Sequence, residues 1–161
     1  MSSDDNVFLY VAVEDVAGWL PSVLGAVAVE DSSLEVGERL FVVDAVTVDQ
    51  QLALLLAPND YGDVDPEPED ISAIDDYAAD LHVRLIGPND EDVQRRECRE
   101  IFDRLVAAHP EVAMLLVQNL SRLSAAHLPG VGTHVFEESI SPDYPHLETW
   151  RPWVRGWRDG R

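Results

Sequence analysis

The sequence predicts a mixed α/β (α+β) fold: a single sheet with a βαβ unit in its C-terminal half and two or three helices. Short apolar runs rich in β-branched residues alternate with fewer amphipathic segments along the 161 residues. The hydrophobic share of 46% and the charged share of 26% are those of an ordinary globular protein. Because the length also suits one domain, we expect residues 1–161 to form a single globular domain.

The N-terminal half predicts the element order β-α-β-β-β. Residues 7–13 are apolar and β-branched, which indicates a buried strand. The helix that follows should have Asp15 as its N-cap and end at Gly25. Because proline fits only the first turn of a helix, Pro21 predicts that this helix starts late or is short. Three further strands are expected at residues 26–30, 39–48 and 51–57.

The C-terminal half predicts a βαβ unit. A strand at residues 81–86 leads into a turn with an N-cap and then a helix over residues 91–108, whose acidic first turn suits the helix dipole. A strand at residues 112–117 should run parallel to the strand at 81–86, beside it or nearly so. Ion pairs with the acid first are expected along the helix at Glu91–Arg95, Asp92–Arg96 and Glu100–Arg104. A short helix at residues 120–127 and a last strand at 131–137 complete the chain.

Two segments stand apart from these elements. Residues 58–76 carry many carboxylates, and Pro66 and Pro68 lie among them, which predicts an exposed acidic loop, with a helical turn around residues 71–79. The tail, residues 148–161, is rich in tryptophan and arginine, and its tryptophans follow helical spacing. We expect Trp150 and Trp153 to be buried against the domain and Trp157 to be more exposed, since free rings would form a costly apolar patch.

The charge of the chain constrains its partners. The chain has 11 basic residues against 31 acidic ones, a net charge of −20. Such a surface repels phosphate, so nucleic acid and anionic membranes are not expected as ligands. Residues 1–83 contain 19 acidic residues and one arginine, Arg39, which concentrates the charge in one half. A basic protein is therefore the expected partner, and we expect contact through Asp60, Asp63, Asp65, Glu67, Glu69, Asp70, Asp75, Asp76 and Trp157.

Common catalytic signatures are absent. The chain contains no lysine and therefore no phosphate-binding P-loop, and it has neither a Gly-x-Gly-x-x-Gly nor a Gly-x-Ser-x-Gly motif. We expect no catalytic residue, no cofactor and no metal site. Cys98 is expected to be a half-buried filler of the helix. A single cysteine and the lack of a signal segment favour the cytoplasm, and arginine without lysine is typical of a GC-rich bacterial genome.

The function that fits these observations best is an acidic binding protein, such as an immunity protein or antitoxin that neutralises a nuclease toxin. Complementary charge accelerates binding, and an acidic inhibitor can occupy the path of the phosphates in a nuclease. Two alternatives stay open. One is a small enzyme with a histidine–carboxylate site around His127, His134 and Glu137. The other is a structural or assembly protein that forms a homodimer through its tryptophan tail.

Overall fold

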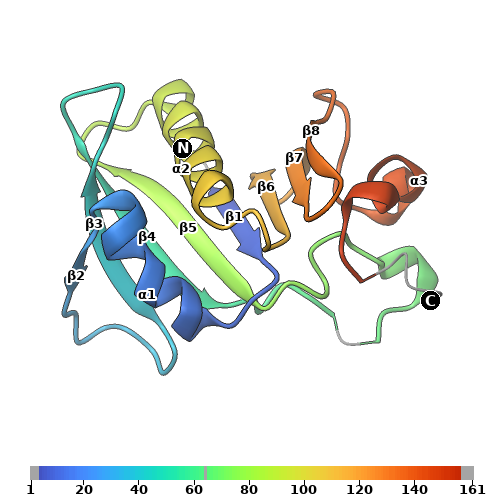
Figure 1. The fold of residues 1–161 in the computed structure, drawn as a ribbon, viewed down its shortest axis with the longest axis horizontal. Coiled ribbons are helices and arrows are strands. Elements are labelled where there is room, and N and C mark those ends of the chain that lie inside the picture. The colour runs from blue at the N-terminus through green and yellow to red at the C-terminus, as the bar shows by residue number, and fades with distance from the viewer. Residues whose placement is uncertain (1–3, 64, 157–161) are drawn as a thin grey trace.

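One antiparallel sheet of eight strands organises the protein (Figure 1). The computed structural model describes residues 4–63 and 65–156. The strands follow the spatial order β2-β3-β4-β5-β1-β6-β7-β8. Their bounds are β1 Asp5–Leu9, β2 Val27–Val29, β3 Arg39–Asp44, β4 Gln51–Pro58, β5 Ala79–Ile86, β6 Met114–Gln118, β7 Arg122–Leu128 and β8 Gly132–Val135.

Three α-helices accompany the sheet, which confirms the predicted mixed α/β class. They are α1 Val13–Leu24, α2 Glu91–Ala108 and the single-turn α3 Leu147–Trp150. Short 3-10 helices lie at Pro68–Asp70, Tyr144–His146 and Arg151–Trp153. No helix in residues 4–63 and 65–156 combines the length and the apolar character that a membrane span requires.

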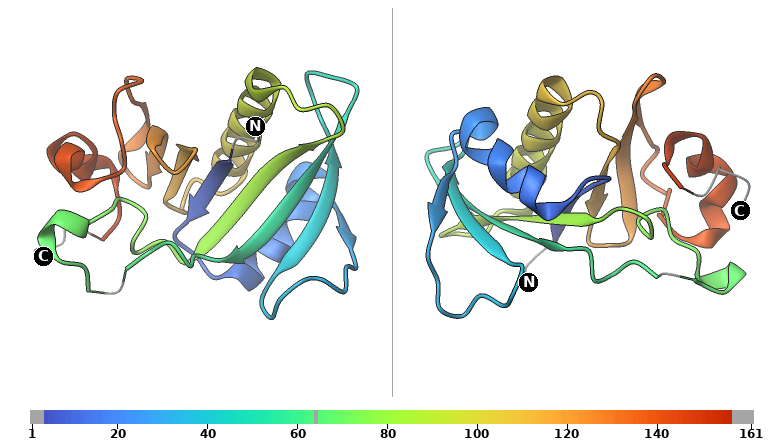
Figure 2. Two further views of the ribbon diagram at one scale, coloured as in Figure 1. Left: turned by 180° about the vertical axis from the view of Figure 1, so that it is seen from behind. Right: turned by 60° about the horizontal axis from the view of Figure 1, so that its bottom comes forward.

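Two apolar cores lie on opposite faces of the sheet. The first lies between the sheet and the helices α1 and α2, where Leu20 and Phe102 are fully buried. The second lies on the other face, over β1, β6 and β7, where residues 71–77 and the C-terminal segment 147–154 cover the strands. Figure 2 shows that this second cover does not extend across β3, β4 and β5. One half of the sheet is therefore covered on both faces, and the other half on one face only.

The predicted βαβ relation is confirmed. Strands β5 and β6 are both antiparallel to β1, which lies between them, so they run in the same direction. Helix α2 connects them, and the Asp90 side chain caps it by accepting bonds from the backbone N–H groups of Asp92 and Val93 at 3.0 and 3.2 Å. The cap satisfies two of the donors that a helix leaves free at its N-terminus.

Helix α1 corrects two expectations. It begins at Val13 after an Ala12 cap without any side-chain bond, so Asp15 is not its N-cap. It also spans 12 residues with Pro21 inside it, so it is neither late nor short. Pro21 removes one hydrogen bond near the C-terminal end, where the buried side chains of Leu20 and Leu24 still hold the helix on the sheet. The predicted end at Gly25 is confirmed, because this glycine adopts the left-handed conformation with φ of 72°.

The predicted helix at residues 120–127 is wrong, because this segment forms strand β7. Asn119 and Leu120 have positive φ values of 53° and 54°, which makes a tight hairpin turn between β6 and β7. Both strands lie inside the sheet and are covered on both faces, so residues 125–128 are all buried. A strand that is covered on both faces needs no alternation of apolar and polar residues. Because the sequence of β7 lacks this alternation, it resembles a short helix.

The C-terminal segment packs on the second core. Trp150 is completely buried, and its indole N–H donates to the carbonyl oxygen of Asp143 at 3.2 Å. Trp153 is half-buried and stacks on the His134 ring, with 4.6 Å between the ring centres. The expectation is thus right for Trp150 and only partly right for Trp153, which stays partly exposed. Trp157 lies outside the described residues.

Candidate functional site

The uncovered face of β2–β5 is apolar. Alternation along these strands sends one set of side chains into the first core and the other set outward. Val27, which begins β2, is 66% exposed. Side chains of this kind in contiguous positions on a sheet mark an interaction surface more often than isolated apolar residues do. The apolar members of this open face are Val27, Val29, Leu40, Val42, Ala53, Leu55, Ala57 and Ile86.

Carboxylates surround this apolar floor. Asp44 closes β3 at one end of the open face, and the carboxylates of the β2–β3 loop lie at the other end. Within the described strands β2–β5, Arg84 is the one arginine on this face. The open face therefore combines an apolar floor with a negative rim, which consists of Glu30, Asp31, Glu38, Asp44 and Asp60.

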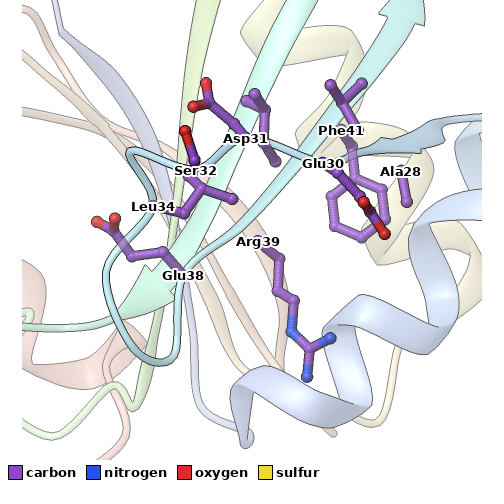
Figure 3. Close-up of a pocket in the computed structure, with 10 residues that line it drawn as sticks. Ala28, Glu30, Asp31, Ser32, Leu34, Glu38, Arg39 and Phe41 are labelled. Carbon is purple, nitrogen blue, oxygen red and sulfur yellow. The ribbon is translucent and has the colours of Figure 1, made fainter.

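A hollow of about 610 Å³ lies between β2, β3 and the loop that joins them. Figure 3 shows Asp31 and Glu38 projecting from the loop, while the guanidinium of Arg39 points towards α1. Arg39 forms an ion pair with Glu14 of α1 at 2.7 Å. Because its cation is held by Glu14 on the helix-covered side of the sheet, the carboxylates of the loop keep their negative charge towards the solvent.

A second cavity, of about 230 Å³, joins the open face to the acidic loop at residues 58–76. Its apolar walls come from β4 and the start of the loop, and its polar walls come from β5 and the loop. A water molecule occupies about 30 Å³ in the liquid, so the end of a side chain fits here. The lining residues are Glu38, Leu55, Ala57, Pro58, Asp60, Tyr61, Asp80 and His82.

Asp80 is the most unusual group in this cavity, which we call the Asp80 cavity. The residue is only 8% exposed, and one carboxylate oxygen accepts a bond from the Asn6 amide at 2.6 Å. Burial raises the Asp80 pKa to about 6, the charges of Asp60 and Asp4 also raise it, and the Asn6 bond and His82 oppose the shift. No arginine in the described residues forms an ion pair with Asp80, so at neutral pH the cavity wall bears an uncompensated charge.

The predicted contact residues are not all equivalent in the structure. Asp75 is half-buried and accepts bonds from the backbone N–H groups of Ser72 and Asp63 at 2.9 and 3.1 Å, so it shapes the loop. Asp76 is half-buried beside Gly156, where an added Cβ would approach its carboxylate to 2.0 Å. Trp157 falls outside the described residues. The remaining six are exposed to solvent: Asp60, Asp63, Asp65, Glu67, Glu69 and Asp70.

Sequence reasoning missed the part of the site that lies on strands. Asp80, His82 and Arg84 alternate with apolar residues in β5, and this period of two is the signal that could have placed them on one outward face. Glu38 was not predicted as a site residue because it belongs to a turn. The pairing of β3 with β4 brings this turn to the Asp80 cavity.

The structure does not bring together the histidines of the alternative histidine–carboxylate site. His127 faces the first core, while His134 packs on the second core against Phe136 and Trp153, so the sheet separates the two rings. His127 is also saturated, with ring nitrogens 2.9 Å from Thr133 Oγ1 and 2.8 Å from the Pro110 carbonyl oxygen.

Other groups with potential chemistry are also accounted for. In residues 4–63 and 65–156, no three histidine, cysteine or carboxylate side chains gather as metal ligands. Cys98 is 1% exposed, and burial raises the pKa of its thiol, so it is more deeply buried than expected.

Comparison with known proteins leaves the site to be interpreted from its own geometry. No protein-family model matches the sequence, and no curated protein or solved structure is significantly similar to the chain.

Proposed function

We propose that this chain is an acidic binding protein that masks a basic protein, in the manner of an immunity protein or antitoxin acting in the cytoplasm. The contact surface is the open face of β2–β5 together with the exposed carboxylates of residues 58–76. One observation carries the proposal: half of the sheet presents an apolar floor inside a negative rim, with no helix over it in the described chain. An apolar centre with a charged rim is the usual composition of a protein interface.

Charge complementarity selects the partner. A second copy of this chain would bring the same carboxylates against each other, and like charges across an interface cost several kcal/mol. A partner with lysine or arginine around an apolar patch would gain both hydrophobic burial and a faster association.

The Asp80 cavity supplies an anchor for that partner. An arginine or lysine side chain entering it would meet the Asp80 carboxylate, with Glu38 and Asp60 close by and the Tyr61 ring in the wall. The incoming cation would compensate a buried charge that has no ion-pair partner in the described chain, and such pairs are often strong contributors at interfaces.

The absence of lysine makes a direct test possible. Carbodiimide joins carboxylates to amines without a spacer, and apart from its N-terminal amine this chain offers no amine of its own. Links to lysines in native cell extract at low salt are therefore links to other proteins. We expect the linked proteins to be basic, and the linked carboxylates to be those of Asp31, Glu38, Asp60 and the acidic loop. Links confined to Glu111, Glu137 and Glu138, or acidic linked proteins, would contradict the proposal.

The anchor has a separate test that needs no partner. Agmatine carries the guanidinium of arginine on a short chain, and we expect it to shift the NMR signals of Tyr61 and His82 saturably at millimolar concentration. Asp80→Asn should abolish the shifts, and the matched variant Asp70→Asn in the exposed loop should not. Shifts that persist in Asp80→Asn would contradict a role for the Asp80 cavity as an anchor, without contradicting the wider contact surface.

A further inference from the structure

A hollow of opposite charge lies on the helix-covered side of the sheet and is lined by residues of α2, β6, β7 and β8. Figure 1 shows α2 beside β6 on this side of the sheet. Its volume is about 270 Å³. Three arginines of α2 and one of β7 line it, together with a serine of β7 and a single carboxylate. These polar residues are Arg95, Arg96, Arg99, Arg122, Ser124 and Asp92.

The concentration of arginine here needs an explanation. The whole chain has 11 basic residues against 31 acidic ones, yet four arginines share this hollow with one carboxylate. The ion pairs within α2 do not account for this arrangement. Arg95 meets Asp92 at 3.6 Å and Arg99 meets Asp103 at 3.0 Å, both partly exposed pairs of little energetic value.

These pairs also differ from the expected ones. Among the described residues the structure shows no ion pair at Glu91–Arg95, Asp92–Arg96 or Glu100–Arg104. Arg104 instead donates to the Val23 carbonyl oxygen at 3.1 Å.

Two of the guanidinium groups have donors without acceptors. The Nε atoms of Arg95 and Arg122 are buried and have no hydrogen-bond partner among the described residues. Arg122 donates from Nη1 to the Gln118 side-chain oxygen at 3.1 Å, and its side chain also lines the hollow. A buried donor that has lost water and gained no acceptor is destabilising, and the acceptors that guanidinium groups need are those that an oxyanion carries.

An irregularity of the sheet shapes the same place. The pairing of β6 with β7 shifts between Leu116 and Val117, so that Ser124 has no partner in the register. Such bulges turn side chains out of the regular alternation and are common beside binding sites. Here the bulge adds the Ser124 hydroxyl to the arginines that line the hollow.

We propose that this hollow, the α2–β7 arginine site, binds a small oxyanion such as a phosphate or a phosphoryl group. Guanidinium groups match the oxygens of phosphate and carboxylate in paired hydrogen bonds, and the serine hydroxyl adds a further donor. A compact anion suits the site because the strongly negative remainder of the protein repels long polyanions. The site lies away from the open face, so it does not depend on the proposed function.

Inorganic phosphate is the probe that tests the site. Phosphorus NMR of the full chain, at constant ionic strength kept with sodium chloride, should show saturable binding in the millimolar range. Arg122→Gln should weaken binding at least tenfold, while the matched Arg84→Gln on the open face should change it less than twofold. Constant ionic strength separates binding from the general screening that any salt exerts on a charged protein.

A second variant guards against a loss of folding in Arg122→Gln. Arg99 lies on α2 with a partly exposed side chain, so Arg99→Gln removes a cation from the hollow without altering β7, and it should weaken phosphate binding several-fold. Acetate serves as a competitor. It should displace phosphate poorly from a site that prefers phosphoryl groups, whereas it would displace phosphate well from a site that prefers carboxylates. Unsaturable phosphate signals in the wild type, or equal binding by both arginine variants and the wild type, would overturn the proposal.

Discussion

Asp80→Asn should stabilise the protein at neutral pH and leave its stability nearly unchanged in acid. The side chain is buried, its pKa in the folded protein is about 6, and the ordinary value is 3.8. The folded state thus holds the Asp80 proton more tightly than the unfolded state does. The stabilisation that this proton provides is complete below pH 3.8 and is lost as the pH rises to about 6.

The magnitude follows from the size of the shift. A pKa displaced by about two units corresponds to about 3 kcal/mol of unfolding free energy. Asparagine has nearly the same shape, cannot ionise and can still accept the Asn6 bond, so it resembles the protonated aspartic acid. We expect the variant to exceed the wild type by up to about 3 kcal/mol at pH 7 and by much less at pH 4.

Urea unfolding from pH 4 to pH 7.5 measures this difference. Other carboxylates and the net charge of −20 affect both proteins equally, so the difference between the two curves isolates Asp80. Asp70→Asn in the exposed loop serves as the control and should show no such trend. A constant difference across the pH range, or a variant less stable than the wild type at pH 7, would show that Asp80 does not titrate with a raised pKa in the folded protein.

Three further predictions concern the frame that holds the site. Trp150→Ala should lower the unfolding free energy, measured in urea, by about 3–5 kcal/mol, because the ring is fully buried in the second core. A loss below about 1 kcal/mol, no larger than that of Trp153→Ala, would contradict this prediction. Glu97→Gln should lower the unfolding free energy by about 1.5–3 kcal/mol at pH 7, because the carboxylate accepts bonds from the backbone N–H groups of Val46 and Thr47 at 2.8 and 2.6 Å. An unchanged unfolding free energy would show that these bonds do not stabilise the β3–β4 turn. Cys98 should react with a thiol reagent only as fast as the protein unfolds, and rapid reaction in native buffer would show that the thiol is accessible.

Local signals in the sequence were sufficient for much of the fold. Helix α2 follows its prediction closely, since its Asp90 cap and apolar stripe lie within one segment. The order β-α-β-β-β of the first half also holds, because its turns and apolar runs alternate clearly. The failures at α1 and β7 share a cause. In both, tertiary burial outweighed a local preference, through Pro21 inside a packed helix and through a strand without an exposed face.

The site was less predictable, because it depends on which strands are neighbours. The acidic loop was visible as a run of carboxylates, and six of its residues are exposed as expected. The open face exists only because β2–β5 pair in order and the C-terminal segment covers the other half of the sheet. Asp80 and Glu38 come together from strand and turn positions that are 42 residues apart, and no local pattern links them.

We propose that this negative, partly apolar surface binds a basic protein. The decisive measurement is the association rate between this chain and the protein that carbodiimide links to it, followed by stopped-flow at increasing salt. The rate is compared between the wild type and a variant neutralised at Asp63, Asp65, Glu67, Glu69 and Asp70. Because the Debye length shrinks to about 4 Å near 0.5 M salt, we expect the wild-type rate to fall steeply and the variant to start slower with a weaker salt dependence. Equal rates for both proteins at every salt concentration would contradict the claim.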